Sequence, residues 1–399
     1  MAQTQSNLFP SYGRFPITLV KGEGSRLWDD QGKEYIDLMC GLAVTNLGHA
    51  PEAVKEKLKL QLDELWHVSN LYHIPGQEKL ASLLTANSCT DRVFFCNSGA
   101  EANEAAIKLA RKYHQKVLGT GRYEIITFQQ SFHGRTLATL TATGQDKVKE
   151  GFTPLPDGFV HVSFNDIEAV KHAVNDRTAA IMLEFLQAEG GVHAADPDFV
   201  SGIVELCKDH GILLIADEIQ TGMGRTGKLF AYEHYGIEPD IITLAKGLGS
   251  GFPIGAMLGK EKLAEAFGPG SHGSTFGGTP LACSVGIATV ETMVEQGIPA
   301  RAQQMGELAV SLLQERLAGN PLVKDIRGKG LLIGIECVHA VADYIAEAQK
   351  RGVLPVSAGP NVIRLLPALT IPEADLKQGI DIVCGILTEA ASQSTANRS

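Results

Sequence analysis

Short runs of apolar residues alternate with segments of helical spacing over much of the chain. Each run is apolar throughout rather than at every second position, which predicts a strand buried on both faces. Such strands, separated by helices, are typical of a mostly parallel sheet with helices packed against both sides. The predicted strands are residues 93–96, 123–128, 159–162, 179–186, 212–216 and 241–244.

Outside this alternation the pattern predicts smaller units at the two ends of the chain. We expect residues 1–50 to join the small domain, residues 51–296 to form the large domain, and residues 297–399 to form a small C-terminal α+β domain. Before residue 297, the other expected elements are a hairpin at 26–38 and helices at 51–65, 77–84, 100–117 and 280–294. Beyond residue 297 we expect two helices, a hairpin at 323–335, a helix at 341–351, a strand at 362–365 and a last helix. The polar tail from residue 391 is expected to fray.

Lys246 follows the last strand of the alternation and begins a glycine-rich segment. A lysine confined at the end of a buried strand is suited to attack a carbonyl carbon or to form a Schiff base. The alternative is a surface lysine at the start of a flexible loop. The other strand ends bear on this choice, because ligands of open α/β sheets collect at the carboxyl ends of the strands.

Two of those strand ends carry anionic or anion-binding groups. Asp217 follows strand 212–216, where a partly buried carboxylate needs a cationic partner; a helix cap or a structural ion pair is the alternative. Ser98, Gly99 and Ala100 begin a helix after strand 93–96. They predict a capping box with Glu101, a phosphate site made of backbone N–H groups, or both.

The segment after strand 123–128 supplies an aromatic plane at Phe132 and a cation at Arg135. We expect His133 between them to be a hydrogen-bonded structural residue, since no second ligand stands at metal spacing. A reactive lysine, a carboxylate, a phosphate site and a flat aromatic ring are together what pyridoxal 5′-phosphate requires. The carboxylate would keep the pyridine nitrogen protonated, so that the ring can take up carbanion electrons.

Residues 222–227 match G-x-G-x-x-G, the pattern of dinucleotide-binding loops. That loop should follow its strand directly and open a helix. Here residues 217–221 intervene, and residues 228–235 leave room for only a short helix. A nicotinamide-dependent dehydrogenase is therefore a remote alternative.

Composition excludes several other classes of protein. The 399-residue chain is 44% hydrophobic and has a formal net charge of -10, which disfavours nucleic acid and anionic membranes as partners. Its seven cysteines are scattered without a C-x-x-C motif, so we expect a reducing compartment, no disulfide framework and no cysteine zinc site. We also expect no metal among the site residues. Residues 1–10 do not resemble a signal peptide, and no apolar run reaches the roughly 18 residues of a membrane span. We expect a cytoplasmic protein.

Four segments resemble those of the class III (ω-) aminotransferases: VFFCNSGAEANEAAIKLARKY, FHGRT, LLIADEIQTGMGRTGKLFAYEHYGIEPDIITLAKGLGSGFPIGAML and GSTFGGTPLAC. The resemblance extends from about residue 12 to the last helix, and DE-x-Q-TG-x-GRTG with its downstream lysine is highly specific. Because of GLAVTNLGHA, FHGRT and its compact length, the chain is most similar to the acetylornithine aminotransferases of this family.

The resemblance implies an α/β protein with the pyridoxal-phosphate-dependent transferase fold of aspartate-aminotransferase type. It implies a homodimer whose active sites lie at the subunit interface. The implied reaction moves the terminal amino group of N-acetylornithine to 2-oxoglutarate, giving N-acetylglutamate semialdehyde and glutamate in arginine biosynthesis. A catalytically silent protein of the same fold is disfavoured, because Lys246, Asp217 and Arg135 are all present.

The resemblance also implies a role for each residue of the site. Lys246 forms the Schiff base and moves a proton between the substrate and cofactor carbons, and Asp217 pairs with the pyridine nitrogen. The other implied cofactor contacts are Gln220 near the ring hydroxyl, Ile219 and Phe132 against the ring, Ser98, Gly99 and Ala100 at the phosphate, and Thr275 at the phosphate from the neighbouring subunit. The implied substrate contacts are Ser274, Arg135 and Arg364.

We hypothesise that Glu189 masks Arg364 while a terminal-amine donor is bound and moves away when glutamate binds. A permanent ion pair is the alternative. The segment around Glu189 departs from the E-P-x-Q-G-E usual in relatives, with Phe185 for proline and Ala188 for glycine. Substrate choice therefore stays open between N-acetylornithine and N-succinylornithine, succinyl-diaminopimelate, ornithine or 4-aminobutyrate.

Overall fold

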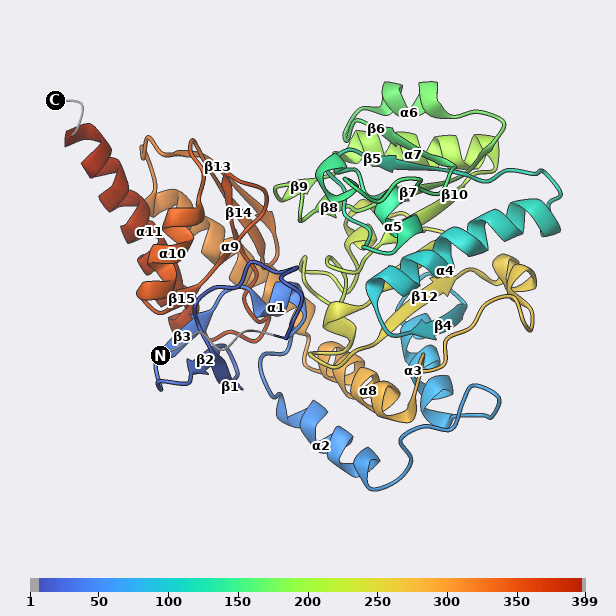
Figure 1. The fold of residues 1–399 in the computed structure, drawn as a ribbon, viewed down its shortest axis with the longest axis horizontal. Helices are drawn as coiled ribbons and strands as arrows, with labels where there is room; N and C mark the ends of the chain where they lie inside the picture. Colours follow the sequence, from blue (N-terminus) through green and yellow to red (C-terminus); the bar gives the residue numbers. More distant parts are fainter. Residues whose placement is uncertain (1–6, 397–399) are drawn as a thin grey trace.

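The computed structural model describes residues 7–396; residues 1–6 of the polar amino-terminal segment and residues 397–399 of the predicted tail lie outside the described part. A seven-stranded sheet has the order β4-β12-β11-β10-β7-β5-β6 (Figure 1). Only β12 runs against its neighbours, so the mostly parallel sheet is confirmed. The strands are β4 (Arg92–Cys96), β5 (Glu124–Phe128), β6 (Phe159–Val162), β7 (Thr178–Leu183), β10 (Leu213–Asp217), β11 (Ile241–Leu244) and β12 (Gly255–Gly259).

Successive residues of the central strands point into two different hydrophobic cores. Ile215 and Ile241 belong to the core that contains the apolar side of α4 (Gly99–Lys112). Leu214 and Ile242 belong to the core that contains residues of α7 (Pro197–His210) and α8 (Pro280–Glu295). Helices therefore cover both faces of the sheet, which is why its strands are apolar throughout.

The antiparallel strand β12 was not expected from the sequence. Its first residue, Gly255, lies so close to the start of α4 that a Cβ there would be 2.5 Å from the Ser98 carbonyl oxygen. Glycine within a strand often marks such a close approach of backbone, but it also weakens the strand pattern in the sequence. The glycine that lets β12 pack beside α4 is thus also the reason that the strand was missed.

The chain ends meet in a smaller unit, where the blue amino-terminal strands lie beside the orange and red C-terminal elements (Figure 1). The expected hairpin is β2 (Arg26–Asp29) and β3 (Glu34–Asp37), and β3 also pairs with β15 (Val353–Leu354). The other elements here are β1 (Leu19–Glu23), α9 (Ile298–Arg316), β13 (Val323–Lys329), β14 (Leu332–Cys337), α10 (Ala342–Lys350), β16 (Val356–Ser357), β17 (Val362–Leu365) and α11 (Glu373–Ala396).

Two expectations for this unit were wrong. One helix, α9, stands where two were expected, because its apolar positions form one continuous buried side from Ile298 to Leu313. The last helix, α11, continues to Ala396, so residues 391–396 are helical rather than a frayed tail.

The remaining elements surround the central sheet. The helix expected at 100–117 is α4 followed by a π-helical turn at Tyr113–Val117. No helix within residues 7–396 is long and apolar enough to cross a membrane. The other elements are α1 (Cys40–Ala43), α2 (Glu52–Leu62), α3 (Pro75–Ala86), α5 (Leu137–Ala142), α6 (Ile167–Ala173), β8 (Leu186–Gln187) and β9 (His193–Ala194).

Candidate active site

The carboxyl ends of β10 and β11 meet at a cavity of about 250 Å³, here called the inner cavity. β10 and β11 are parallel neighbours, so the residues that end them arrive at the same edge of the sheet. The lining residues are Gly99, Ala100, Phe132, His133, Gly134, Arg135, Glu184, Asp217, Ile219, Gln220, Thr221 and Lys246. Most of the predicted cofactor contacts are thus brought together in one place.

Lys246 begins a short turn separated from the end of β11 by one residue, with a backbone φ of 41°. Positive φ is uncommon for a residue with a side chain and marks a strained position. Burial lowers the pKa of the Lys246 ammonium, and the nearby Arg364 acts in the same direction, against the carboxylates of Glu189, Asp217 and Glu184. Within residues 7–396 the amine makes no hydrogen bond or ion pair, so it is available to react.

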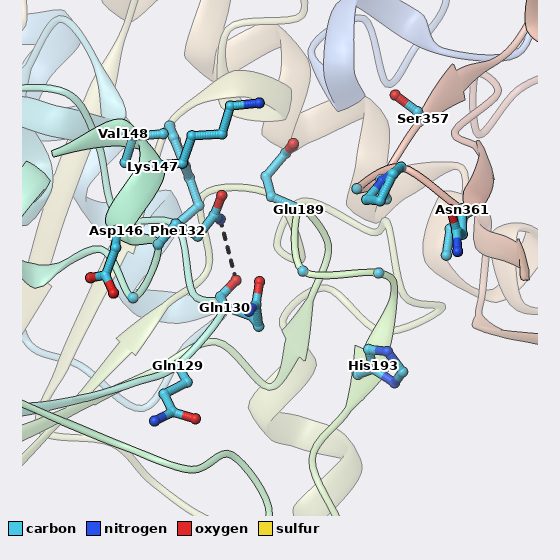
Figure 2. A pocket seen from close by; sticks show the side chains of 18 of the residues that line it. Gln129, Gln130, Phe132, Asp146, Lys147, Val148, Glu189, His193, Ser357 and Asn361 are labelled. Carbon is cyan, nitrogen blue, oxygen red and sulfur yellow. Dashed lines mark hydrogen bonds between the residues drawn. The ribbon is translucent and has the colours of Figure 1, made fainter. Parts of the chain in front are cut away.

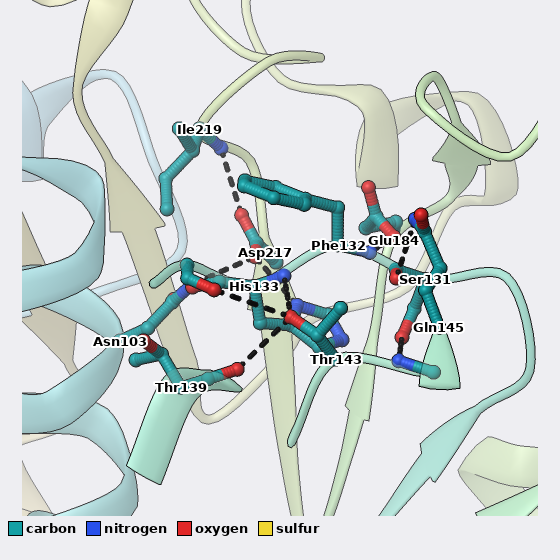
Figure 3. Close-up of polar contacts among 12 residues, drawn as sticks. Asn103, Ser131, Phe132, His133, Thr139, Thr143, Gln145, Glu184, Asp217 and Ile219 are labelled. Atoms are coloured by element: carbon teal, nitrogen blue, oxygen red, sulfur yellow. Dashed lines mark hydrogen bonds and ion pairs between the residues drawn. The ribbon is translucent and has the colours of Figure 1, made fainter. Parts of the chain in front are cut away.

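Asp217 ends β10 and is held by three N–H donors (Figure 3). Its Oδ2 lies 2.7 Å from Nδ1 of His133 and 2.8 Å from Nδ2 of Asn103, and its Oδ1 accepts from the Ile219 N–H at 3.1 Å. Because a carboxylate can only accept hydrogen bonds, the His133 tautomer must carry its proton on Nδ1. These donors fix the carboxylate in one orientation in the wall of the inner cavity.

His133 is therefore the hydrogen-bonded structural residue that the sequence predicted, with Asp217 as its partner. Asn103 was missed. It is fully buried on the apolar side of α4, where a polar side chain must find a partner. The sequence showed a polar residue at a buried position of the helix, but it did not identify Asp217 as the partner. Within residues 7–396 no group of His, Cys, Asp and Glu side chains suits a metal ion.

Phe132 and Ile219 flank the Asp217 carboxylate (Figure 3). The backbone N–H of Phe132 donates to Oε2 of Glu184 at 3.0 Å. Arg135, on the same loop, lies with its guanidinium 5.6 Å from the centre of the Phe132 ring. Arg135 is exposed and forms no ion pair among the described residues, so its charge is available to an anion that enters the cavity.

The start of α4 has both a capping box and unpaired backbone N–H groups, the two features considered from the sequence. Oγ of Ser98 accepts from the Glu101 N–H at 3.2 Å, and Oε2 of Glu101 accepts from the Asn97 N–H at 2.6 Å, so the helix is capped. The N–H groups of Gly99 and Ala100 have no acceptor among residues 7–396. The cap therefore leaves free donors at the positive end of the helix, beside the inner cavity.

Gly99 allows the start of α4 to pack closely against Ile219. A Cβ at this position would lie 2.8 Å from Cδ1 of Ile219, closer than carbon atoms can approach. Any larger residue would displace Ile219 from the cavity wall.

Glu189, Arg364 and Gln220 form a second cluster of polar side chains beside Lys246. Nη1 of Arg364 donates to Oε1 of Glu189 at 2.7 Å, to the Ala188 carbonyl at 3.0 Å and to Oε1 of Gln220 at 3.1 Å. Nε2 of Gln220 donates to Glu189 at 3.1 Å. Arg364 is 1% exposed and its Nε has no partner within residues 7–396, so the cation is buried and held largely by Glu189.

Glu189 also faces a cavity of about 1530 Å³, here called the outer cavity (Figure 2). The outer cavity shares Phe132 and Arg135 with the inner one. Burial raises the pKa of Glu189, but the Arg364 cation, together with Lys246 and Gln220, lowers it by more, so the net shift is downward. Glu189 therefore presents to the outer cavity a carboxylate that is paired with Arg364.

The unusual segment 184–189 is accommodated by local packing. β7 ends at Leu183, earlier than expected, and the chain continues as the short β8. The buried Phe185 ring stacks on Tyr235 with 5.3 Å between centres. Ala188 is buried and presents its carbonyl to Arg364. Glu189 still reaches Arg364, despite both substitutions.

Ser274 and Thr275 lie away from the inner cavity of their own chain. Oγ of Ser274 contacts Nδ2 of Asn97 at 3.1 Å and the Gly277 N–H at 3.0 Å. Thr275 is exposed and lines neither cavity. The single chain thus does not bring these two residues to the site.

The G-x-G-x-x-G segment 222–227 forms a turn whose own arginine is buried and hydrogen-bonded. Arg225 is fully buried and donates to Oδ1 of Asn46 at 2.6 Å, to the Leu331 carbonyl at 3.0 Å and to the Pro367 carbonyl at 2.6 Å. The turn is therefore a structural link between distant parts of the chain. The N–H groups of all three of its glycines already donate to backbone carbonyls, unlike those of a dinucleotide loop.

Comparisons with known proteins agree with this geometry. Residues 9–387 match the family model described as "Aminotransferase class-III". The acetylornithine aminotransferase of Oceanobacillus iheyensis is 52% identical over 375 residues, 94% of each chain. The acetylornithine aminotransferase structure from Elizabethkingia anophelis has a TM-score of 0.85 at 32% identity over 96% of each chain. An ornithine aminotransferase structure from Toxoplasma gondii, described as having partial occupancy of PLP at its active site, has a TM-score of 0.94 at 31% identity over 97% of this chain and 93% of that one.

Proposed function

Because the chain belongs to the class III aminotransferases, which use pyridoxal 5′-phosphate, we propose that it transfers the terminal amino group of N-acetylornithine to 2-oxoglutarate. One observation carries the proposal. Lys246, which has no partner among the described residues, a fixed Asp217 and the N–H groups that begin α4 line one cavity, in a chain about half identical to acetylornithine aminotransferases.

The described residues fit pyridoxal 5′-phosphate. The free donors of Gly99 and Ala100, with Ser98 at the cap, suit its phosphate. The apolar sides of Phe132 and Ile219 suit the two faces of a flat ring. We assign Asp217 to the pyridine nitrogen, Gln220 to the ring hydroxyl and Lys246 to the carbonyl carbon.

When bound, the cofactor supplies an aldehyde for Schiff-base formation and a ring that takes up electrons. The amine of Lys246 suits both nucleophile and base, because its lowered pKa leaves more of it neutral near pH 7. As a base, its Nζ would remove a proton from the carbon that bears the donor's amino group. It would then deliver a proton to the cofactor carbon. Asp217, oriented by His133, provides the counter-charge for a protonated ring nitrogen.

Arg135 and Arg364 divide the recognition of carboxylates. We assign the free carboxylate of N-acetylornithine to Arg135, which is exposed, unpaired and shared by both cavities. For glutamate we assign the α-carboxylate to Arg364. Since Arg364 is bonded to Glu189, an apolar donor chain meets a neutralised pair rather than a bare cation. Glutamate would displace Glu189 and take its place on Arg364.

We further propose a homodimer in which the partner subunit's Thr275 contacts the cofactor phosphate, with Ser274 beside it near the substrate. Support comes from large apolar side chains exposed around this segment, among them Leu71 at 88% and Phe276 at 61%. His67 contacts Phe276, and Asn70 donates to the Ser274 carbonyl, so these residues form one surface. An exposed apolar patch of this kind is typical of a subunit interface.

Mixed dimers test the shared site. A Lys246→Ala subunit, inactive alone, and a Thr275→Ala subunit, weakly active alone, should regain activity when combined, because one of the two sites then holds intact Lys246 and Thr275. No recovery in dimers shown to be mixed would contradict a Thr275 supplied across the interface.

We propose the same division of the chain as the sequence suggested: residues 51–296 as the large domain, and residues 1–50 with 297–399 as the smaller part. The pairing of β3 with β15 and the ion pair of Arg26 with Asp375 at 2.6 Å support the joining of the two ends. All seven cysteines are free thiols, which supports a reducing, cytoplasmic location.

A panel of amino donors with 2-oxoglutarate as acceptor tests the substrate. We expect the highest kcat/KM with N-acetylornithine, and a yellow protein whose colour bleaches on addition of donor. Higher kcat/KM with N-succinylornithine, succinyl-diaminopimelate, ornithine or 4-aminobutyrate would reassign the donor within the family. A colourless protein that reduces a nicotinamide cofactor would overturn the reaction itself.

A further inference from the structure

Glu184 is a buried carboxyl in the wall of the inner cavity to which the proposed mechanism gives no role. It follows β7 directly, is 6% exposed, and lines the cavity together with Asp217 and Lys246. Its Oε2 accepts the Phe132 N–H at 3.0 Å, and it forms no ion pair among residues 7–396. A buried, ionised carboxylate without a cation bonded to it would be costly.

The groups that face Glu184 make ionisation still less favourable. Burial raises its pKa well above the usual value, and the Asp217 carboxylate, followed by that of Glu189, adds to the increase. The Phe132 N–H and the Lys246 amine act in the opposite direction and do not cancel it. Glu189 differs from Glu184 because Arg364 is bonded to it.

We propose that Glu184 is a positioning residue: as a neutral carboxylic acid, it holds the 131–136 loop through the Phe132 N–H and leaves Asp217 as the anion beside His133. This role rests on the proposed function of the inner cavity. Figure 3 shows Glu184 beside Phe132, on the side away from Asn103.

The position of this one hydrogen bond explains why it matters. Phe132 forms one face of the inner cavity, His133 orients Asp217, and Arg135 is the free cation shared with the outer cavity. All three belong to one short loop whose backbone at Phe132 is tied to Glu184. Loss of the bond would free the backbone at Phe132 and with it one face of the cavity, whereas His133 would keep its bonds with Thr143 and Asn103. An ionised Glu184 would instead place a second negative charge beside Asp217.

The test compares Glu184→Gln with Glu184→Leu, because glutamine copies a neutral acid with one acceptor and one donor, whereas leucine removes both. Glu218→Gln is the matched control. Glu218 is also a buried glutamate after a strand, with its pKa raised to about 7 chiefly by burial, but it bonds to Thr221 and to the Tyr232 N–H and does not line the inner cavity. Two readouts are independent of the donor: hydrogen exchange of the Phe132 amide in cofactor-free protein, and infrared absorption of protonated carboxyl groups.

In Glu184→Leu we expect the Phe132 amide to exchange at least about tenfold faster, since a buried donor loses its acceptor. In the holoenzyme, the pH at which the visible band titrates should shift, and kcat/KM should fall about tenfold or more. Glu184→Gln should match the wild type in exchange and titration and remain within about threefold in kcat/KM. Glu218→Gln should leave the Phe132 amide unchanged.

Three results would overturn the proposal. If Glu184→Gln changes the titration of the visible band and kcat/KM as much as Glu184→Leu does, Glu184 works as an ionised carboxylate. Unchanged Phe132 exchange in Glu184→Leu would mean that it does not hold the loop. If the leucine variant does not fold, the infrared spectrum of Glu184→Gln is subtracted from that of the wild type. Absence of a protonated-carboxyl band from this difference would refute a neutral Glu184. A different physiological donor would change the kinetic substrate but none of the measurements on cofactor-free protein.

Discussion

Removal of the Glu189 carboxylate should separate the two half-reactions. In the structure Glu189 supplies the only carboxylate among the described residues that is bonded to Arg364, with Nη1 and Oε1 2.7 Å apart. In Glu189→Ala, the guanidinium keeps the Ala188 carbonyl and Oε1 of Gln220 as acceptors, but neither carries a charge. A donor with an apolar chain would then lie against an unneutralised cation, whereas glutamate would find Arg364 already free.

The size of the effect follows from the burial of the pair. A hydrogen bond to a charged group contributes about 1.5–3 kcal/mol. Arg364 is 1% exposed, but the Glu189 side chain is 27% exposed, so water partly screens the pair and about 2 kcal/mol is the expected loss. That energy corresponds to a factor of about 30 in rate. We expect the N-acetylornithine half-reaction to slow by up to about thirtyfold, and the glutamate half-reaction to be unchanged or faster.

Single-turnover absorbance changes, with each donor mixed alone with the holoenzyme, measure the two halves separately. Glu189→Gln is the matched control, because it keeps one acceptor oxygen at the same length, and its effect should lie between wild type and alanine. If both half-reactions slow by the same factor in Glu189→Ala, Glu189 is a permanent brace for Arg364 and the masking hypothesis is wrong.

The same pair predicts a dependence of stability on pH. The pKa of Glu189 is lower in the folded protein than its ordinary value of 4.5, because of Arg364. A lowered carboxyl pKa stabilises the fold above the unfolded value, and this contribution is lost as the pH falls through the folded value. The difference in unfolding free energy between wild type and Glu189→Ala should therefore be present at pH 7 and shrink below pH 4.5.

Three further substitutions test the remaining assignments. Lys246→Ala should abolish turnover, and borohydride reduction of the wild type should fix the label on Lys246; label on another lysine would reassign the nucleophile. Asp217→Asn should fold normally but lose far more than tenfold in kcat, since the amide carries no charge to favour a protonated ring nitrogen; a loss below tenfold, about 1.4 kcal/mol, would make Asp217 structural. Arg135→Lys should raise KM for both N-acetylornithine and 2-oxoglutarate, because a lysine cannot bind a carboxylate through two parallel N–H groups; unchanged KM values for both would remove Arg135 from the substrate site.

The sequence alone determined the layered fold and the strand ends that carry the chemistry. Runs that are apolar throughout require cover on both faces, and the structure has α4 on one face and α7 and α8 on the other. Polar residues placed directly after such runs must lie at the carboxyl edge of the sheet, which is where Asp217 and Lys246 are found. Both conclusions follow from the local periodicity of apolar residues, so they could be reached from a single sequence without a structure.

Tertiary structure alone decided which side chains meet at that edge. Asn103 bonds to Asp217 across 114 positions of sequence, and Arg364 reaches Glu189 across 175. Periodicity assigns a residue to a face but not to a partner, and no local pattern distinguishes a buried acid with a cation from one without. The difference between Glu189, paired with Arg364, and Glu184, bonded only to a backbone N–H, therefore appears only once β17 and the 131–136 loop are packed around them. Strand β12 was hidden for a related reason: Gly255 is needed by a close approach to α4, and that contact exists only in the folded chain.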